Sequence, residues 1–187
     1  VVVTENERSL CADLAACLKY KTEHLDTHID RLKDYKIIYT TGFFITSNPE
    51  ALKKVAAYAA DHKITMGFNL SATFLVEGCK DLYNEIITYV NIVFGNEDEC
   101  DSFGKAHGIE STDRKEIAKH IAQIENKNAT TTRTVIIHQG SQDTIVATHN
   151  FESGETDVTT FEVEQLTKAE IVDTNSAGDS FAGGYLG

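Results

Sequence analysis

The sequence predicts an α/β fold: a doubly wound, mostly parallel sheet with helices on both faces and antiparallel strands at one edge. Short β-rich runs alternate with segments of helical periodicity through most of the 187 residues. The last two β-rich runs, residues 143–149 and 156–164, have no helical segment between them and should pair antiparallel. A chain of this length, 41% hydrophobic and 25% charged, fits one folded domain.

The expected strands are runs rich in Val, Ile, Thr and aromatic residues, bounded by turn-forming residues. In chain order they are residues 1–4, 36–44, 64–70, 90–96, 133–140, 143–149 and 156–164. Ligands of such sheets bind at the carboxyl ends of the parallel strands. Polar residues that directly follow these strands are therefore the first candidates for a site.

Helical segments separate most of these strands. In chain order they cover residues 8–20, run on from Asn48, cover residues 80–89 and run on from Asp113. The first rests on Leu10, Leu14 and Leu18, which recur every four residues. The second has Asn48 as its N-cap and Pro49 at its first helical position. The last opens on an Asp-x-x-Glu capping pattern.

Charge and composition exclude several classes of partner. The formal net charge is −12 and Lys and Arg form no basic stripe, so no nucleic-acid partner is expected. No apolar run approaches the roughly 20 residues of a membrane-spanning helix, so no membrane partner is expected. Cys11, Cys17, Cys79 and Cys100 show no zinc spacing. Reduced thiols in a cytoplasmic protein are expected, with a nuclear location also open.

The stretch DTNSAGDSFAGG, residues 173–184, places two carboxylates around small residues where a helix begins. The backbone amides of Ser176, Ala177 and Gly178 can converge on an anion there, assisted by the partial positive charge of the helix start. Asp179 would lie in the first helical turn. An anion hole beside a carboxylate is what phosphoryl transfer needs. The spacing alone is equally compatible with an Asp that only favours a helix N-terminus.

This stretch resembles the D-T-x-G-A-G-D signature of the ribokinase-like, or phosphofructokinase-B-type, carbohydrate and nucleoside kinases. Five further segments, in order and at suitable spacing, resemble the adenosine kinase family within that group. They are NERSLCADLAA (6–16), TGFFITSNPEALKKVA (41–56), FNLSATF (68–74), FGNEDE (94–99) and HQGSQDTIVAT (138–148). The resemblance covers essentially the whole chain and implies the ribokinase-like fold.

The resemblance also implies an activity: transfer of the γ-phosphate of ATP to the 5′-hydroxyl of adenosine, giving AMP, with Mg²⁺ as cofactor. Asp179 takes the place of the catalytic base, and Arg8 matches an Arg near the transferred phosphate. The family's anion hole is carried over to Ser176, Ala177 and Gly178. ATP and adenosine are therefore the expected ligands, and a monomer is the expected state.

Other residues match the family's ligand contacts. The family's apolar contacts to the nucleoside match Leu10, Leu14 and Phe43. Its contacts to ATP and the phosphates match Asn69, Asn96, Glu99, Gln139 and Gly140. Glu99 is expected to hold Mg²⁺ through water. Without the family, the leucines fit a core, the Asn-x-x-Glu pair a helix cap and Gly140 a hairpin turn.

The chain departs from the family pattern in three ways. Ser176 stands where Gly is usual; a negative φ would leave its hydroxyl able to cap the helix, whereas a positive φ is strained. His138 stands where Thr is common. The match is to the middle and later part of the family's large domain, so residues 1–187 are expected to form an incomplete domain that is inactive alone.

Three alternatives stay open. Another ribokinase-like kinase would act on a sugar or a different nucleoside, although Phe43 with Leu10 and Leu14 favours a flat apolar base. A catalytically silent homologue would bind a nucleoside without turnover. A plain α/β interaction domain would leave the five ordered segments unexplained.

Overall fold

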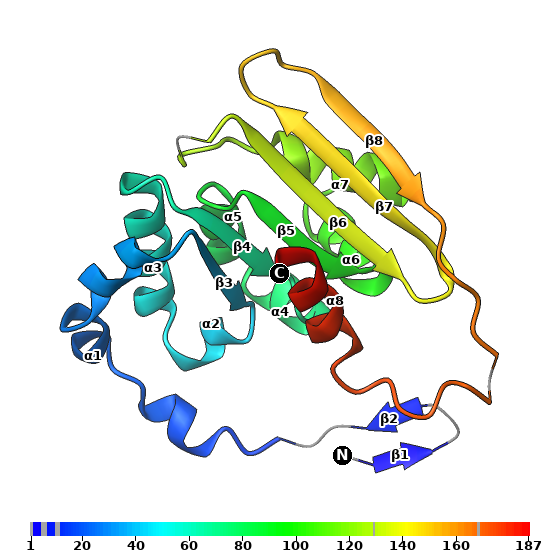
Figure 1. Cartoon of the computed structure of the whole chain (residues 1–187), viewed down its shortest axis with the longest axis horizontal. Helices are drawn as coiled ribbons and strands as arrows, with labels where there is room; N and C mark the ends of the chain where they lie inside the picture. Colours follow the sequence, from blue (N-terminus) through cyan, green and yellow to red (C-terminus); the bar gives the residue numbers. More distant parts are fainter. Residues whose placement is uncertain (1, 5–6, 10–11, 129, 168) are drawn as a thin grey trace.

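The computed structural model describes residues 2–4, 7–9, 12–128, 130–167 and 169–187. Six strands form one sheet in the order β3-β4-β5-β6-β7-β8 (Figure 1). They are β3 (Ile37–Thr41), β4 (Thr65–Asn69), β5 (Ile92–Asn96), β6 (Thr132–Gln139), β7 (Gln142–Asn150) and β8 (Thr156–Phe161). β3 to β6 run parallel, and β7 and β8 add antiparallel. The predicted mostly parallel sheet with an antiparallel edge is confirmed.

Helices cover the two faces of the sheet unequally. The α-helices are α1 (Thr22–Asp26), α2 (Phe44–Ser47), α3 (Pro49–Asp61), α4 (Thr73–Gly78), α5 (Lys80–Ile87), α6 (Glu97–Ala106), α7 (Arg114–Gln123) and α8 (Ala177–Leu186). Two 3₁₀ helices, η1 (Ala15–Lys19) and η2 (Ile29–Asp34), flank α1. Helices α3 to α7 contribute to the large core on one face, and α8 lies across the other (Figure 1). Helices therefore lie on both faces, as predicted.

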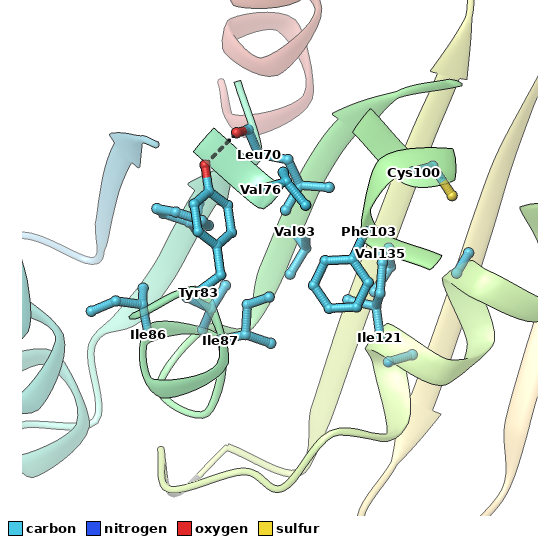
Figure 2. Packing of buried hydrophobic residues seen from close by; sticks show 14 of the residues in the cluster. Leu70, Val76, Tyr83, Ile86, Ile87, Val93, Cys100, Phe103, Ile121 and Val135 are labelled. Atoms are coloured by element: carbon cyan, nitrogen blue, oxygen red, sulfur yellow. Dashed lines mark hydrogen bonds between the residues drawn. The ribbon is translucent and has the colours of Figure 1, made fainter. Parts of the chain in front are cut away.

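The core is divided by the sheet into two clusters. Figure 2 shows the larger one, in which side chains of α4 to α7 gather around Val93 of β5 and Val135 of β6. Its buried Tyr83 donates a 2.6 Å hydrogen bond to the backbone oxygen of Leu70. The smaller cluster joins Phe94, Ile136 and Ala182 under α8. Strands buried on both faces explain the continuous apolar runs in this part of the sequence.

Local capping signals were predicted well. The Asn48 side chain accepts a hydrogen bond from the Ala51 amide at 2.9 Å, and Pro49 is the first residue of α3. The Asp113 side chain caps α7, with the Lys115 amide as the donor at 2.9 Å. Both signals depend only on neighbouring residues, which is why the sequence reveals them.

The predicted helix over residues 8–20 is wrong. The segment holds β2 (Glu7–Ser9), which pairs with β1 (Val2–Thr4), and later only the short helix η1. Leu14 and Leu18 are 38% and 52% exposed, so their periodicity does not mark a face that packs on a core. A short helix gains most of its stability from such packing and is marginal without it.

Candidate active site

The first turn of α8 lies at the carboxyl ends of the parallel strands. Asn69 ends β4 and Asn96 ends β5, and His138 is paired with Asn96 on β6. A Cβ built on Gly178 would lie 3.6 Å from Nε2 of His138, so the helix start rests directly on the end of β6. This is the edge at which the sequence predicted a ligand site.

The predicted anion hole is the amino-terminal turn of α8. The amide of Ser180 closes the first intrahelical bond, to the oxygen of Ser176 at 2.8 Å. The amide of Ala177 contacts the oxygen of Thr174 at 3.3 Å, a long bond. The amide of Gly178 thus belongs to the free end of the helix, where unpaired N–H groups and the helix dipole favour an anion.

Ser176 adopts the strained backbone conformation. Its φ is 58° and its ψ is 16°, in the left-handed region that favours glycine. Its side chain makes no capping hydrogen bond. The Ser176 hydroxyl therefore does not cap α8. Capping was expected only with a negative φ, and the turn into α8 requires a positive one.

Asp179 lies in the first turn of α8 and is exposed. The pKa of Tyr39 on β3 is raised, mainly by burial and further by the charges of Asp179 and Glu99, while the hydrogen bond from Asn69 opposes the rise. An Asp side chain at this place, beside a helix start, can accept a proton from a bound hydroxyl.

Asn96 and Glu99 form a reciprocal cap at the start of α6. The Asn96 side chain accepts from the Glu99 amide at 2.8 Å, and both Glu99 oxygens accept from Asn96 at 3.0 Å. The helix cap that spacing alone suggested is confirmed. Burial raises the pKa of Glu99, while the backbone N–H groups of Asn96 and Ser71 oppose the rise.

The side-chain oxygens at the carboxyl ends of the parallel strands suit a Mg²⁺ ion that keeps its waters better than one that carboxylates bind directly. The described residues contain no group of three or more His, Cys, Asp or Glu side chains arranged to hold a metal. Both oxygens of Glu99 already accept from Asn96, so an ion near Glu99 would be contacted through water. Mg²⁺ keeps several waters in such sites.

The ends of β3 and β4 are tied together by a polar network. Asn69 is 8% exposed; its side-chain oxygen accepts from the Ser71 amide at 2.8 Å and its side-chain nitrogen donates to the Tyr39 hydroxyl at 3.3 Å. The Gly42 amide lies 2.8 Å from the oxygen of Asn69 and 2.9 Å from the hydroxyl of Ser71. Sequence reasoning found Asn69 and missed Tyr39, which no local motif marks.

Two aromatic rings stand exposed beside this network. Phe43, the N-cap of α2, is 47% exposed, and its ring centroid is 6.4 Å from that of Phe74 on α4. Phe74 was missed, although it ends the quoted segment FNLSATF. Leu14 lies at the start of η1 and is partly exposed. Leu10 lies outside the described residues, and of Arg8 only the backbone, in β2, is described.

Gln139 and Gly140 form the hairpin between β6 and β7. Gly140 has a φ of 58°, and Gln139 pairs with Gln142 across the two-residue turn. The turn that composition suggested is confirmed. The Gln139 side chain accepts from Arg114 of α7 at 3.0 Å and donates to the oxygen of Asp143 at 2.6 Å. It is therefore held on the α7 side, away from α8.

Comparison with known proteins places the whole chain in one family. The model of the pfkB family of carbohydrate kinases matches residues 1–187. The adenosine kinase of Schizosaccharomyces pombe is 40% identical over 190 residues, which cover 100% of this chain and 54% of that protein. Adenosine kinase 2 of Arabidopsis thaliana is 38% identical, with 100% and 53% covered. The chain thus spans about half the length of these curated relatives.

Solved structures share the fold. Anopheles gambiae adenosine kinase, in complex with P1,P4-di(adenosine-5) tetraphosphate, matches with a TM-score of 0.91 and 38% identity, covering 98% of this chain and 53% of that one. Schistosoma mansoni adenosine kinase, in complex with 2-fluoroadenosine, matches with a TM-score of 0.83 and 32% identity, covering 92% and 49%. No helix among the described residues is long and apolar enough to cross a membrane. With its whole length matched by the family model, this chain belongs to the pfkB family of carbohydrate kinases.

Proposed function

We propose that the protein carrying this sequence transfers the γ-phosphate of ATP to the 5′-hydroxyl of adenosine and releases AMP and ADP. The observation that carries the proposal is the place of Asp179 in the first turn of α8, a turn that rests on His138 at the carboxyl end of β6. Relatives named adenosine kinase, at 40% and 38% identity over the whole chain, support the choice of substrate.

The geometry gives each part of the site a task. Asp179 accepts the proton of the attacking hydroxyl as the oxygen–phosphorus bond forms. The amide of Gly178 and the dipole of α8 stabilise the charge on the transferred phosphoryl group. Asn69 and Asn96 present carboxamides at the ends of β4 and β5, where the remaining phosphates of ATP would lie. Mg²⁺, when bound near Glu99 through water, supplies positive charge to the phosphates.

The nucleoside base would lie against Phe43 and Phe74. Their rings are inclined at 51° with centroids 6.4 Å apart, and both are exposed. Exposed aromatic pairs beside a polar site are suited to a flat heterocycle, which gains from stacking and from burial of apolar area. A bare sugar would leave both rings in water, so this pair favours a nucleoside.

The biological setting follows from the reaction. Conversion of a free nucleoside into its monophosphate returns a purine to the nucleotide pool, which is purine salvage. We expect a cytoplasmic monomer that needs only its two small substrates and Mg²⁺.

The test is a substrate panel with the natural protein at full length. ATP and Mg²⁺ are supplied with adenosine, other nucleosides, ribose or fructose, and the products are separated and identified. Selective formation of AMP supports the proposal. Turnover of a sugar would keep the mechanism and replace the substrate, whereas binding of adenosine without turnover would identify a silent homologue. Residues 1–187 assayed alone should be inactive.

A further inference from the structure

A chain of side-chain contacts, which the activity described above does not use, holds the hairpin between β6 and β7. Arg114, the first residue of α7, donates from Nε and Nη2 to the two carboxylate oxygens of Asp101 on α6, at 2.9 and 2.7 Å. Its Nη1 donates to Oε1 of Gln139 at 3.0 Å. A single guanidinium group therefore ties α6 and α7 to the last residue of β6.

The hydrogen bonds of Gln139 leave its side chain one orientation. A guanidinium group can only donate, so the Gln139 oxygen must face Arg114. The backbone oxygen of Asp143 can only accept, so the Gln139 nitrogen must face it, at 2.6 Å. Both ends of the carboxamide are thus engaged, and this half-buried side chain connects α7 to β7.

These contacts lie where the pairing of β6 with β7 is irregular. Ile137 pairs with Ile145, but Gln139 pairs with Gln142, so two residues of β7 lie opposite His138. A bulge of this kind interrupts the ladder of backbone hydrogen bonds. Backbone pairing alone therefore fixes the end of the hairpin less firmly than the middle, and the contacts of Arg114 and Gln139 act at the interrupted place.

His138 lies next to Gln139 on β6 and faces the other side of the sheet. Side chains alternate along a strand, so Gln139 faces α7 and His138 faces α8. The centroid of the His138 ring is 5.4 Å from that of Phe181, and a Cβ built on Gly178 would lie 3.6 Å from Nε2 of His138. The first turn of α8 thus rests on the residue that precedes Gln139.

We propose that Arg114 is a positioning residue for ATP, which acts through Gln139 to fix the end of β6 so that His138 supports the helix start where the phosphates bind. Arg114 itself is engaged by Asp101 and Gln139 and is given no contact with ATP. The rings proposed to hold the base belong to α2 and α4, outside this chain of contacts. This inference rests on the proposed function, because it assigns a task in that reaction.

The decisive variant is Arg114→Met, which keeps most of the length of the side chain and removes its hydrogen bonds to Asp101 and Gln139. With the natural protein at full length, we expect the KM for ATP to rise about fivefold and the KM for adenosine to change less than about twofold, because only the phosphate-binding turn loses its support. A purely structural role would lower the amount of active protein, which reduces kcat and leaves both KM values unchanged.

Lys115→Met is the matched control. Lys115 is the next residue of α7, it is exposed, and its side chain forms no hydrogen bond or ion pair with the described residues. The variant removes the same charge from the same helical turn, so it measures any general electrostatic effect on the binding of the anionic ATP. It should keep both KM values. The thermal unfolding midpoints of both variants should match that of the parent protein within a few degrees.

A double-mutant cycle with Gln139→Met completes the test. If Arg114 acts through Gln139, the double variant should have no higher KM for ATP than Arg114→Met alone. Additive rises would show that Arg114 acts on ATP independently of Gln139 and would overturn the inference. A parent-like KM for ATP in Arg114→Met, or an equal rise in Lys115→Met, would also overturn it. Failure of the parent protein to phosphorylate adenosine would instead overturn the proposed function, so the two failures are distinguishable.

Discussion

Arg133 and Asp179 lie at opposite ends of the parallel strands, and their surroundings differ in kind. Arg133, at the amino end of β6, is 0% exposed, and its donations within the described residues all go to backbone oxygens. These belong to Ile87, Val90, Ile121, Ala122, Ile124 and Glu125. Asp179, at the carboxyl ends, is exposed and faces the open start of a helix.

The neighbours of the two residues follow the same division. At the amino ends, the Asn91 side chain accepts from the Met66 amide at 2.8 Å and from Asn128 at 3.0 Å, both within the buried layer. At the carboxyl ends, polar groups border exposed rings and a strained Ser176. Most polar groups at the amino ends are bonded within the chain and hold the fold, although the side-chain oxygen of Asn128 has no described partner. Polar groups at the carboxyl ends are left partly open and are available to a ligand.

The largest expected effect is a loss of stability when Arg133, at the amino end of β6, is replaced. Arg133→Met keeps the length of the side chain and leaves several buried carbonyl groups at the ends of α5 and α7 without a donor. At about 1–3 kcal/mol for each such group, we expect the free energy of unfolding to fall by about 5 kcal/mol. Urea denaturation followed by circular dichroism measures the loss. Arg31→Met, at an exposed position in η2, should change it by less than about 0.5 kcal/mol.

The matching change at the carboxyl ends should spare stability and remove activity. Asp179→Asn preserves shape and removes the proton acceptor, so kcat of the full-length protein should fall about 10³-fold, equivalent to about 4 kcal/mol in the barrier. The free energy of unfolding should change by less than about 0.5 kcal/mol. Steady-state kinetics and urea denaturation measure the two quantities, and unchanged turnover would remove Asp179 from the reaction.

Sequence alone predicted the sheet, its antiparallel edge and the caps at Asn48 and Asn96, because those signals are local. It placed the start of a helix next to Ser176, with Asp179 in the first turn, for the same reason. The helix over residues 8–20 was wrong because periodic leucines indicate a helix only where a core covers them. Arg133 was missed because its acceptors lie between 8 and 46 residues away in the sequence.

Tyr39 and Ser176 show the same limit at the site itself. Nothing next to Tyr39 in sequence marks a residue of the site, and Asn69, whose side chain donates to the Tyr39 hydroxyl, is distant along the chain. The φ of Ser176 depends on how the chain enters α8, so the sequence could state only what each sign of φ would mean. Prediction from sequence therefore reached the local structure of the motif and stopped at its tertiary surroundings.

A smaller effect should appear in the pH dependence of the free energy of unfolding, because the carboxyl group of Glu99 is buried, unlike the exposed carboxyl groups. Burial raises the pKa of Glu99, so the native state binds its proton more tightly than the unfolded chain does. Stability from this group is present below its ordinary pKa and is lost as pH rises through the raised value. Glu99→Gln should abolish that loss, so its stability relative to the parent protein should increase from about pH 4 to pH 7.

The measurement is urea denaturation of both proteins at several pH values without Mg²⁺, which would offset the cost of the buried charge. Glu110→Gln, at an exposed position between α6 and α7, is the control, because the charge of Glu110 is not among the causes of the shifted pKa of Glu99. A difference between Glu99→Gln and the parent protein that stays constant with pH would show that Glu99 is ionised in the native state as readily as in the unfolded chain.

The smallest expected effect comes from Ser176, where the active-site end carries backbone strain. Ser176→Gly suits the observed φ of 58° and should raise the free energy of unfolding by about 0.5–1 kcal/mol, the strain relieved less the extra entropy that glycine loses. Ser180→Gly, one turn further into α8, has no strain to relieve and should lower it by a similar amount. Urea denaturation measures both. If Ser176→Gly also changes kcat, the serine side chain contributes to the anion hole in addition to its backbone. The contrast between amino ends that are bonded within the chain and carboxyl ends that are open to a ligand would then extend to this side chain.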